Sequence, residues 1–439
     1  RRCVGARGAR ALSGADANRQ APARAAVAPV QMRRYRAAWV LPIAGPPIEN
    51  ATFTVDQGRV VSVESTSPTG SAGGEADVDL GSVVVLPGLV NAHAHIELSY
   101  LEGRVAPAAA MPQWVDELIG ARREASSAVG EPAPEVIAAI ERAIVEMRRH
   151  GTALVGDISN TLATVEPLRR SPLAAVVFHE ILGFNPSDAD MDAARAAEAI
   201  DLAGEGDARV SLAAHAPYSV APALFEALRR TVAARCPDAP LAVHLAESAE
   251  EVAFLADGRG PWRQLLERLG VWNPSWRAPA CGPVEFLERV GWLGHRVVVV
   301  HGVHLQAAEL AVLARRAMTL VTCPRSNAWT GAGTPPVERF VESGVPLAVG
   351  TDSLASAPDL NLFSELARLR ALAPNVPASV FLASATIGGA RALGWDDAFG
   401  TIESGKRAAL IAVTVPSPVT DVEEYLLGGI EASTITWVE

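Results

Sequence analysis

The central part of the chain alternates between short, continuously apolar runs and longer segments in which apolar residues recur with helical spacing. Apolar runs of this length, bounded by turn residues, are typical of strands that are buried on both faces. The predicted strands are Val83–Leu86 with Leu89–Val90, Ala153–Val155, Ala174–Phe178, Val210–Ala214, Leu241–Val243, Val297–Val300, Leu320–Val321 and Leu347–Val349. Helical spacing falls between most of them, for example at Glu135–Arg149, Ala221–Ala234, Ala307–Arg316 and Leu362–Leu372.

This order of elements predicts an α/β fold, and we expect residues 87–398 to form a parallel (β/α)8 TIM barrel. A doubly wound parallel sheet is the alternative, but the sequence has no G-x-G-x-x-G motif to support it. The segment 112–135, after the first strand, is long enough to form a lid. We expect the segments 100–135 and 253–290 to set the size of a substrate pocket.

Both ends of the chain show a different pattern. Short β-type runs at Ala37–Pro42, Thr52–Val55 and Arg59–Val63 are separated by turn residues, and 400–414 is similar. We expect residues 32–86 and 399–439 to build one small β-sandwich domain. Residues 1–31 are rich in Ala and Arg and lack the apolar core of a secretory signal, so they are expected to be a disordered extension.

Composition narrows the class of function. A net charge of −11 does not attract the phosphates of nucleic acids. No uncharged apolar run reaches the roughly 18 residues of a membrane-spanning helix, so a membrane partner is not expected. The scattered cysteines indicate neither a disulfide framework nor a cysteine-built zinc site, and they fit a cytoplasmic protein. These residues are Cys3, Cys236, Cys281 and Cys323.

Polar side chains follow the predicted strands at their carboxyl ends, where barrel enzymes carry their chemistry. The first strand runs into His93 and His95, and residues two apart in an extended chain point the same way. Later strands end at His215, His244, His301 and Asp352. A single H-x-H pair is weak evidence, but burying so many titratable groups is costly without a purpose. A metal ion supplies such a purpose.

We therefore expect one divalent ion with an open position for water. Imidazole and carboxylate ligands suit zinc first and iron second. Lys406 is the only lysine of the chain and is not near the barrel strands, so a metal pair bridged by a carboxylated lysine is excluded. The expected ligands are His93, His95, His244 and Asp352.

Three residues are expected to be catalytic. Glu247 follows His244 by three residues and is expected to move protons rather than to bind the ion. The alternative is a solvated glutamate at the start of a helix, since two further glutamates follow it. His301 is expected to orient or deprotonate the water, and Asp352 to do the same while it ligates.

The remaining candidates are interpreted as structural. His150, His179 and His295 are expected on the surface or in the core, and His304 is expected to be structural. Cys323 has no suitable base nearby in the sequence, which favours a packing thiol over a nucleophile.

These motifs carry a family resemblance. The segment from Pro87 to His95 resembles the opening signature of the amidohydrolase superfamily, and His244–Glu247, His301–His304 and Gly350–Asp352 resemble its later motifs. The set resembles the branch with one metal, which contains cytosine, guanine and S-adenosylhomocysteine deaminases and triazine chlorohydrolases. The resemblance covers roughly residues 32–435. It implies a strand beyond Val438, so the last strand is expected to be missing from this chain.

Several segments narrow the resemblance to the aminodeoxyfutalosine deaminases, which convert 6-amino-6-deoxyfutalosine to futalosine on a menaquinone route. These segments are 93–99, 156–160, 171–178, 215–220 and 322–327. The resemblance implies that His215 and Asn327 contact the substrate base and that Glu97 contacts a polar part of the substrate.

Hydrolytic deamination of a purine-like heteroaromatic amine is the expected reaction. Zinc lowers the pKa of its water towards about 7, and Glu247 protonates the ring nitrogen as hydroxide attacks the amine-bearing carbon, after which ammonia leaves. Alternatives are deamination of S-adenosylhomocysteine, adenosine or another nucleobase, triazine-type dechlorination, a silent metal-binding barrel, and a two-metal cyclic amidase. A homodimer or homotetramer is left open.

Overall fold

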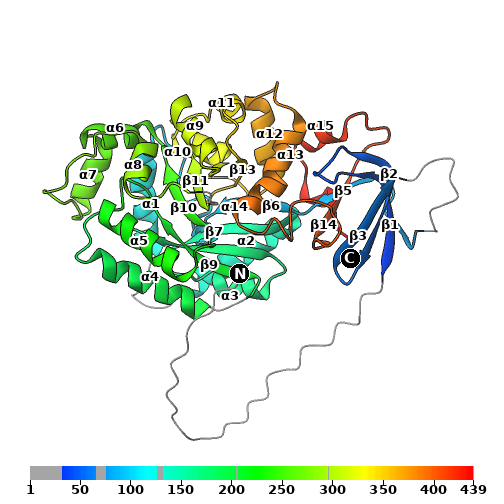
Figure 1. Ribbon diagram of the computed structural model, residues 1–439, viewed down its shortest axis with the longest axis horizontal. Helices are drawn as coiled ribbons and strands as arrows, with labels where there is room; N and C mark the ends of the chain where they lie inside the picture. Colours follow the sequence, from blue (N-terminus) through cyan, green and yellow to red (C-terminus); the bar gives the residue numbers. More distant parts are fainter. Residues whose placement is uncertain (1–31, 66–75, 126–131, 204–205, 295, 439) are drawn as a thin grey trace, which may run out of the picture.

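Two sheets organise the chain. The computed structural model describes residues 32–65, 76–125, 132–203, 206–294 and 296–438, so the expected extension at 1–31 lies outside the described residues. One sheet has eight strands and the other has seven. Figure 1 shows the larger sheet surrounded by helices, with the smaller sheet beside it.

The eight-stranded sheet is a nearly closed parallel barrel, as expected. Its strands follow chain order from β6 to β13, and each pairs with its neighbours. They are β6 (Leu89–Ala94), β7 (Thr152–Ser159), β8 (Ala174–Ile181), β9 (Ala208–Ala214), β10 (Leu241–Leu245), β11 (Val297–His301), β12 (Thr319–Thr322) and β13 (Leu347–Val349). The ends meet where the Asp352 N–H donates a hydrogen bond to the His93 carbonyl, 3.1 Å away.

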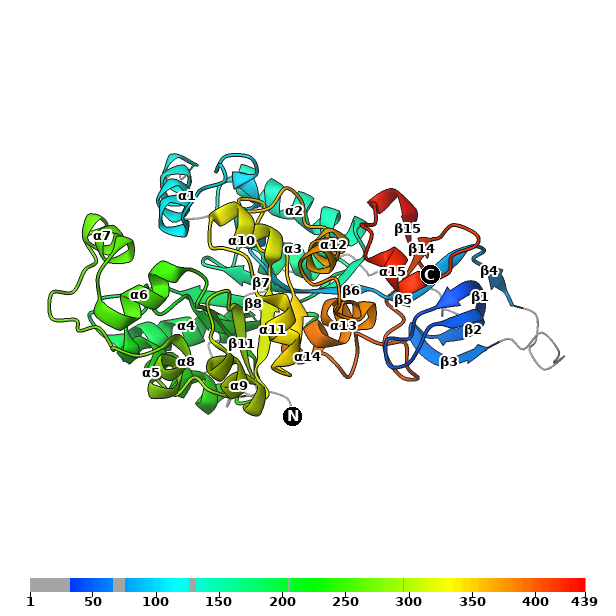
Figure 2. The same ribbon diagram turned by 90° about the horizontal axis from the view of Figure 1, so that it is seen from above.

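Helices cover the outside of the barrel (Figure 2). In α2 (Pro134–Arg149), the buried residues Ile140, Ala143, Ile144 and Met147 recur every three or four positions and pack towards β7 and β8. The other helices between or after the strands are α1 (Met111–Ala125), α3 (Val165–Arg170), α4 (Ala189–Ala203), α5 (Pro222–Arg235), α6 (Ala249–Asp257), α7 (Pro261–Arg268), α8 (Pro283–Arg289), α9 (Ala307–Arg315), α10 (Pro324–Thr330), α11 (Val337–Glu342), α12 (Leu362–Leu372), α13 (Ala378–Ala383) and α14 (Gly389–Ala392).

The smaller sheet combines both parts of the chain that flank the barrel. Its strands are β1 (Arg33–Val40), β2 (Ile48–Asp56), β3 (Arg59–Ser65), β4 (Val78–Asp79), β5 (Val83–Pro87), β14 (Leu410–Thr414) and β15 (Ile435–Trp437), with α15 (Val422–Leu426) before the last strand. The order is β15-β14-β5-β1-β2-β3, with β4 also paired to β1. The small β unit expected from both chain ends is therefore present, and its strands form one continuous mixed sheet.

The first predicted strand is divided between the two sheets. Its first half, β5, pairs with β14, whereas its second half begins the barrel as β6. The division falls at Gly88, where a Cβ atom would lie 2.6 Å from the Ala153 Cβ. Glycine therefore lets the chain pass from one sheet to the other in close contact. An apolar run does not reveal this change of partner, because both halves are buried.

None of the helices within the described ranges combines the length and the apolar composition that a membrane crossing requires.

Candidate active site

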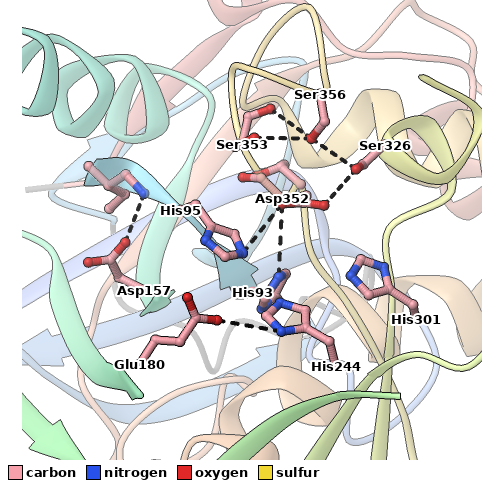
Figure 3. A network of polar contacts seen from close by, with 12 residues as sticks. His93, His95, Asp157, Glu180, His244, His301, Ser326, Asp352, Ser353 and Ser356 are labelled. Carbon is pink, nitrogen blue, oxygen red and sulfur yellow. Dashed lines mark hydrogen bonds and ion pairs between the residues drawn. The ribbon is translucent and has the colours of Figure 1, made fainter. Parts of the chain in front are cut away.

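The carboxyl ends of the barrel strands bring five titratable side chains together. His93 lies in β6 with His95 just after it, His244 lies in β10, His301 ends β11, and Asp352 follows β13. Figure 3 shows their side chains converging from these separate elements. Four of them are buried, and His95 is partly buried. The strand-end rule thus predicted a cluster whose members are up to 259 residues apart (93 to 352).

The donor set fits a divalent cation. The Nε2 atoms of His93 and His95 lie 4.0 and 3.6 Å from Oδ1 of Asp352. His93, His244 and His301 form a second group whose ligand atoms lie within 4.8 Å of one another. His93 Nε2 is buried and has no hydrogen-bond partner. Since a buried polar atom without a partner is costly, a cation coordinated there would stabilise it.

Neighbouring groups orient these side chains. Nδ1 of His244 lies 2.9 Å from the His215 carbonyl, which can only accept, so Nδ1 carries the proton and Nε2 keeps its lone pair. Oδ2 of Asp352 accepts a hydrogen bond from the Ser326 hydroxyl at 2.6 Å, which leaves Oδ1 towards the histidines. Ser356 in turn contacts the Ser326 hydroxyl at 2.9 Å.

Burial keeps the imidazoles neutral, which is the form that binds metals. It lowers the pKa of His95 and of His215 to about 4. It also lowers the pKa of His93 and His301 well below the usual value. At neutral pH each ring therefore offers a nitrogen lone pair rather than a second proton.

Glu247 has the properties of a proton donor. Its side chain is 4% exposed, so the solvated helix-start alternative does not describe it. Burial, followed by the charge of Asp352, raises the pKa of its carboxyl well above the usual value. Its Oε2 lies 3.5 Å from Nε2 of His301. A carboxyl that stays protonated beside the ligand cluster can deliver its proton to a bound molecule.

Asn327 fixes the orientation of the His301 ring. Nδ2 of Asn327 lies 3.0 Å from Nδ1 of His301. Because an amide nitrogen only donates, Nδ1 accepts, and the ring proton lies on Nε2, which faces Glu247. The backbone is strained at two positions of this cluster, with φ of 74° at His301 and 63° at Asp352.

A cavity of about 410 Å³ opens over the cluster. The first long excursion supplies one wall through α1, as expected of a lid, and α7 supplies another. These walls are mainly apolar and include Trp114, Leu118, Trp262, Leu265, Leu269 and Val271. The polar lining is His95, Arg122, Asn160, Glu180, His215, Tyr218, Ser219, His244, Glu247, His301, Thr330, Asp352 and Ser353.

The three predicted substrate contacts lie in different positions. His215 lines the cavity. Glu97 instead accepts hydrogen bonds from the Ser159 hydroxyl at 2.5 Å and the Thr161 N–H at 3.1 Å. Neither Glu97 nor Asn327 belongs to the described residues that line the cavity. Direct contact of Glu97 and Asn327 with the substrate stays a prediction. Their positions favour a role in holding neighbouring residues in place.

The other histidines that lie in the described ranges do not line the cavity. Nδ1 of His150 contacts the Glu146 carbonyl at 3.0 Å, and Nε2 of His304 contacts the Ala332 carbonyl at 2.7 Å. His179 is half-buried in β8, and His295 lies outside the described residues. Burial raises the pKa of the Cys323 thiol well above its usual value, so a thiolate nucleophile is not favoured there.

Seven polar residues of the cavity were assigned no role from the sequence: Arg122, Asn160, Glu180, Tyr218, Ser219, Thr330 and Ser353. Glu180 had a readable signal, because it lies at the carboxyl end of β8 just as His244 does in β10. Arg122 had none, because it lies on α1 and reaches the cavity only through the way that helix packs.

The chain was compared with known proteins. The model of the amidohydrolase family matches residues 84–435. A 5-methylthioadenosine/S-adenosylhomocysteine deaminase of Halobacterium salinarum is 32% identical over 88% of this chain and 87% of its own length. An adenosine deaminase of Xanthomonas campestris with bound zinc is 29% identical, with a TM-score of 0.76 over 92% of this chain and 90% of that one. The aminofutalosine deaminase of Helicobacter pylori is 26% identical, with a TM-score of 0.75 over 90% and 95% of the two chains.

Proposed function

The chain belongs to the amidohydrolase family, and from that premise we propose that it removes the exocyclic amine of a 6-aminopurine nucleoside as ammonia. Hydrolysis of a carbon–nitrogen bond by a deaminase is the activity of the relatives it matches. The observation that carries the proposal is Glu247, a buried carboxyl whose pKa is raised, beside His301 and within the ligand cluster. Deamination of a ring needs such a proton donor at its nitrogen.

Four residues would hold one divalent cation, zinc before iron: His93, His95, His244 and Asp352. Neutral imidazoles with a single carboxylate are a donor set that suits these metals. When bound, the cation lowers the pKa of water towards about 7 and so provides a nucleophile at neutral pH. The choice of metal rests on the donor set and on the zinc of a related structure.

The side chains divide the proton transfers between them. Glu247 gives its proton to the ring nitrogen next to the amine-bearing carbon, which makes that carbon more electrophilic. Asp352 takes the proton released by the attacking water, and the Nε2–H of His301 orients that water. The proton taken by Asp352 then passes to the amine, which leaves as ammonia. The ring nitrogen keeps the proton from Glu247, and the new hydroxyl group returns a proton to Glu247 as the carbonyl forms. One water is consumed for each ammonia released.

The substrate class follows from what the relatives have in common. Their names specify 5-methylthioadenosine and S-adenosylhomocysteine, adenosine, or aminofutalosine, and all of these carry a 6-aminopurine ring on a ribose. 6-Amino-6-deoxyfutalosine, indicated by the sequence motifs, remains one candidate, and with it a place in menaquinone biosynthesis. Methylthioadenosine, S-adenosylhomocysteine and adenosine are the others.

An ammonia-release screen of the zinc-loaded protein tests the proposal. The panel contains aminodeoxyfutalosine, methylthioadenosine, S-adenosylhomocysteine, adenosine, guanine, cytosine and a chlorotriazine. We expect ammonia from at least one adenine nucleoside and no chloride from the chlorotriazine. Chloride release without ammonia would instead support the dechlorinase alternative, and no product from any compound would favour a silent metal-binding barrel.

A further inference from the structure

One polar corner of the cavity has no part in the proposed proton transfers. It consists of Glu180, Asn160 and Arg122, which come from β8, the segment after β7, and α1. The walls around it are mainly apolar. A buried polar group in such a wall needs partners, and it fixes the orientation of a ligand where the ligand supplies them.

One carboxylate oxygen of Glu180 accepts no hydrogen bond in the described contacts. The side chain of Glu180 is 6% exposed, and Oε1 is buried with no hydrogen-bond partner. Oε1 lies 3.6 Å from Nδ1 of His244, but the proton of that nitrogen is directed to the His215 carbonyl at 2.9 Å. A donor from a bound molecule would therefore complete the hydrogen bonding of this carboxylate.

The rest of the corner holds Glu180 in place. Both terminal nitrogens of Arg122 lie 3.3 Å from Oδ1 of Asn160. This contact fixes the amide so that Nδ2 of Asn160 donates to Oε2 of Glu180 at 2.9 Å. The chain of contacts occupies Oε2 and leaves Oε1 as the open acceptor.

We propose that Glu180 recognises the vicinal ribose hydroxyls of the substrate, and this inference rests on the proposed function. A purine substituted at N9 has no ring N–H to donate, and its exocyclic amine is the group that leaves. Its remaining donors are the sugar hydroxyls. Figure 3 shows Glu180 and His301 on opposite sides of His244, so a ligand whose ring faces His301 extends its sugar towards Glu180.

The cavity also favours a nucleoside over a free base. Its volume of about 410 Å³ falls in the range of clefts that take drug-sized ligands. Leu265 and Val271 are among the apolar residues that line the cavity. The substrate class that matches is an adenine ribonucleoside.

The alternative is that Glu180 only orients His244 and does not contact the substrate. In that case, replacing Glu180 would lower activity equally on every substrate, with or without hydroxyls. The ratio of activities on hydroxylated and dehydroxylated ligands therefore separates the two explanations.

The test compares adenosine with 2′,3′-dideoxyadenosine in the zinc-loaded wild type, Glu180→Gln, Glu180→Ala and the control Glu226→Gln, whose carboxylate is half-exposed on α5. We expect wild type and control to favour adenosine in kcat/KM by about 10- to 100-fold, the effect of hydrogen bonds to a charged group. The preference should fall to within about threefold in Glu180→Ala and to an intermediate value in Glu180→Gln. Metal content should be equal in all four proteins.

A wild type that treats both ligands alike would overturn the inference, whether or not the variants fold. So would a Glu180→Ala protein that keeps the full preference. If no nucleoside yields ammonia, the proposed function fails, and the inference is judged by calorimetric binding of the same two ligands to Glu247→Gln. Equal affinities would then overturn it, and tighter binding of adenosine would support it.

Discussion

At the scale of single residues, Glu247 depends on its surroundings for the proton it is proposed to donate. Burial raises the pKa of its carboxyl, and Asp352 adds to this effect. Replacement by glutamine keeps the shape of the side chain but removes the transferable proton. We expect Glu247→Gln to lose about 10²- to 10⁴-fold in turnover, the usual range for a positioned acid or base. Ammonia release and metal content are the measurements.

The matched control is Glu250→Gln. Glu250 lies three positions further along and does not belong to the described residues that line the cavity. It should keep wild-type turnover. Near-normal ammonia release by Glu247→Gln would remove Glu247 from the mechanism.

Ser326 contacts Asp352, one of the proposed metal ligands, and does not belong to the described residues that line the cavity. Its hydroxyl donates to Oδ2 at 2.6 Å and so fixes the direction of Oδ1. We expect Ser326→Ala to weaken zinc binding by about 10- to 100-fold, as replacement of groups behind metal ligands does. Competition with a chelating dye measures this. Ser343→Ala is the control, since the Ser343 hydroxyl donates to the Phe340 carbonyl and accepts the Val345 N–H and has no described contact with Asp352. Equal zinc affinity in both variants would show that Ser326 does not orient Asp352.

The cluster of histidines with Asp352 could be predicted because strand direction determines where its members lie. His93, His244 and Asp352 each follow an apolar run, and parallel strands share one carboxyl edge. The place of Asn327 could not be predicted. It contacts His301 rather than the cavity because of the way α10 packs, and a one-dimensional pattern contains no such information.

At the scale of elements, the turn between β10 and α6 places Glu247, and Glu251 holds that turn. The two carboxylate oxygens of Glu251 accept the N–H groups of Ala246 and Glu247 at 2.8 and 3.1 Å. Ala246 lies in the left-handed region, with φ of 49°. The side chain of Glu251 therefore stabilises an unusual backbone next to the proposed proton donor.

Glu251→Gln offers only one acceptor oxygen for these two N–H groups. We expect a loss of about 1–3 kcal/mol in the free energy of unfolding, the cost of an unsatisfied buried group. Turnover should fall by at least about tenfold through displacement of Glu247, with zinc content unchanged. Denaturant unfolding and steady-state kinetics check the two effects. Full turnover in a destabilised variant would show that Glu251 contributes to stability but not to the position of Glu247.

The seven later barrel strands were also readable from the sequence, because each is a separate apolar run between helical segments. The first run was predicted as one strand, although the expected domain boundary at residue 86 divides it; Val83–Pro87 pairs with β14 in the other sheet. Local hydrophobicity reports burial but not the partner strand. The strand with which Val83–Pro87 pairs depends on the change from one sheet to the other at Gly88.

At the scale of the whole molecule, Gly88 connects the two sheets at a point with no room for a side chain. A Cβ there would meet Ala153 Cβ at 2.6 Å and the Trp437 ring at 2.9 Å. We expect Gly88→Ala to reduce the free energy of unfolding by about 1–3 kcal/mol, as overpacking does. Gly45→Ala, where nothing lies within 4 Å, is the control. Denaturant unfolding of both variants measures the difference in stability. Equal stabilities would show that a Cβ atom can be accommodated at position 88.

We propose that one cation, held by His93, His95, His244 and Asp352, makes the hydrolysis possible. The most direct test is ammonia release from the best nucleoside substrate before chelation, after complete removal of the metal, and during stepwise return of zinc. We predict that activity is lost on removal and is fully restored at one zinc per chain. Undiminished activity in metal-free protein, or restoration only at two zinc ions per chain, would contradict the account.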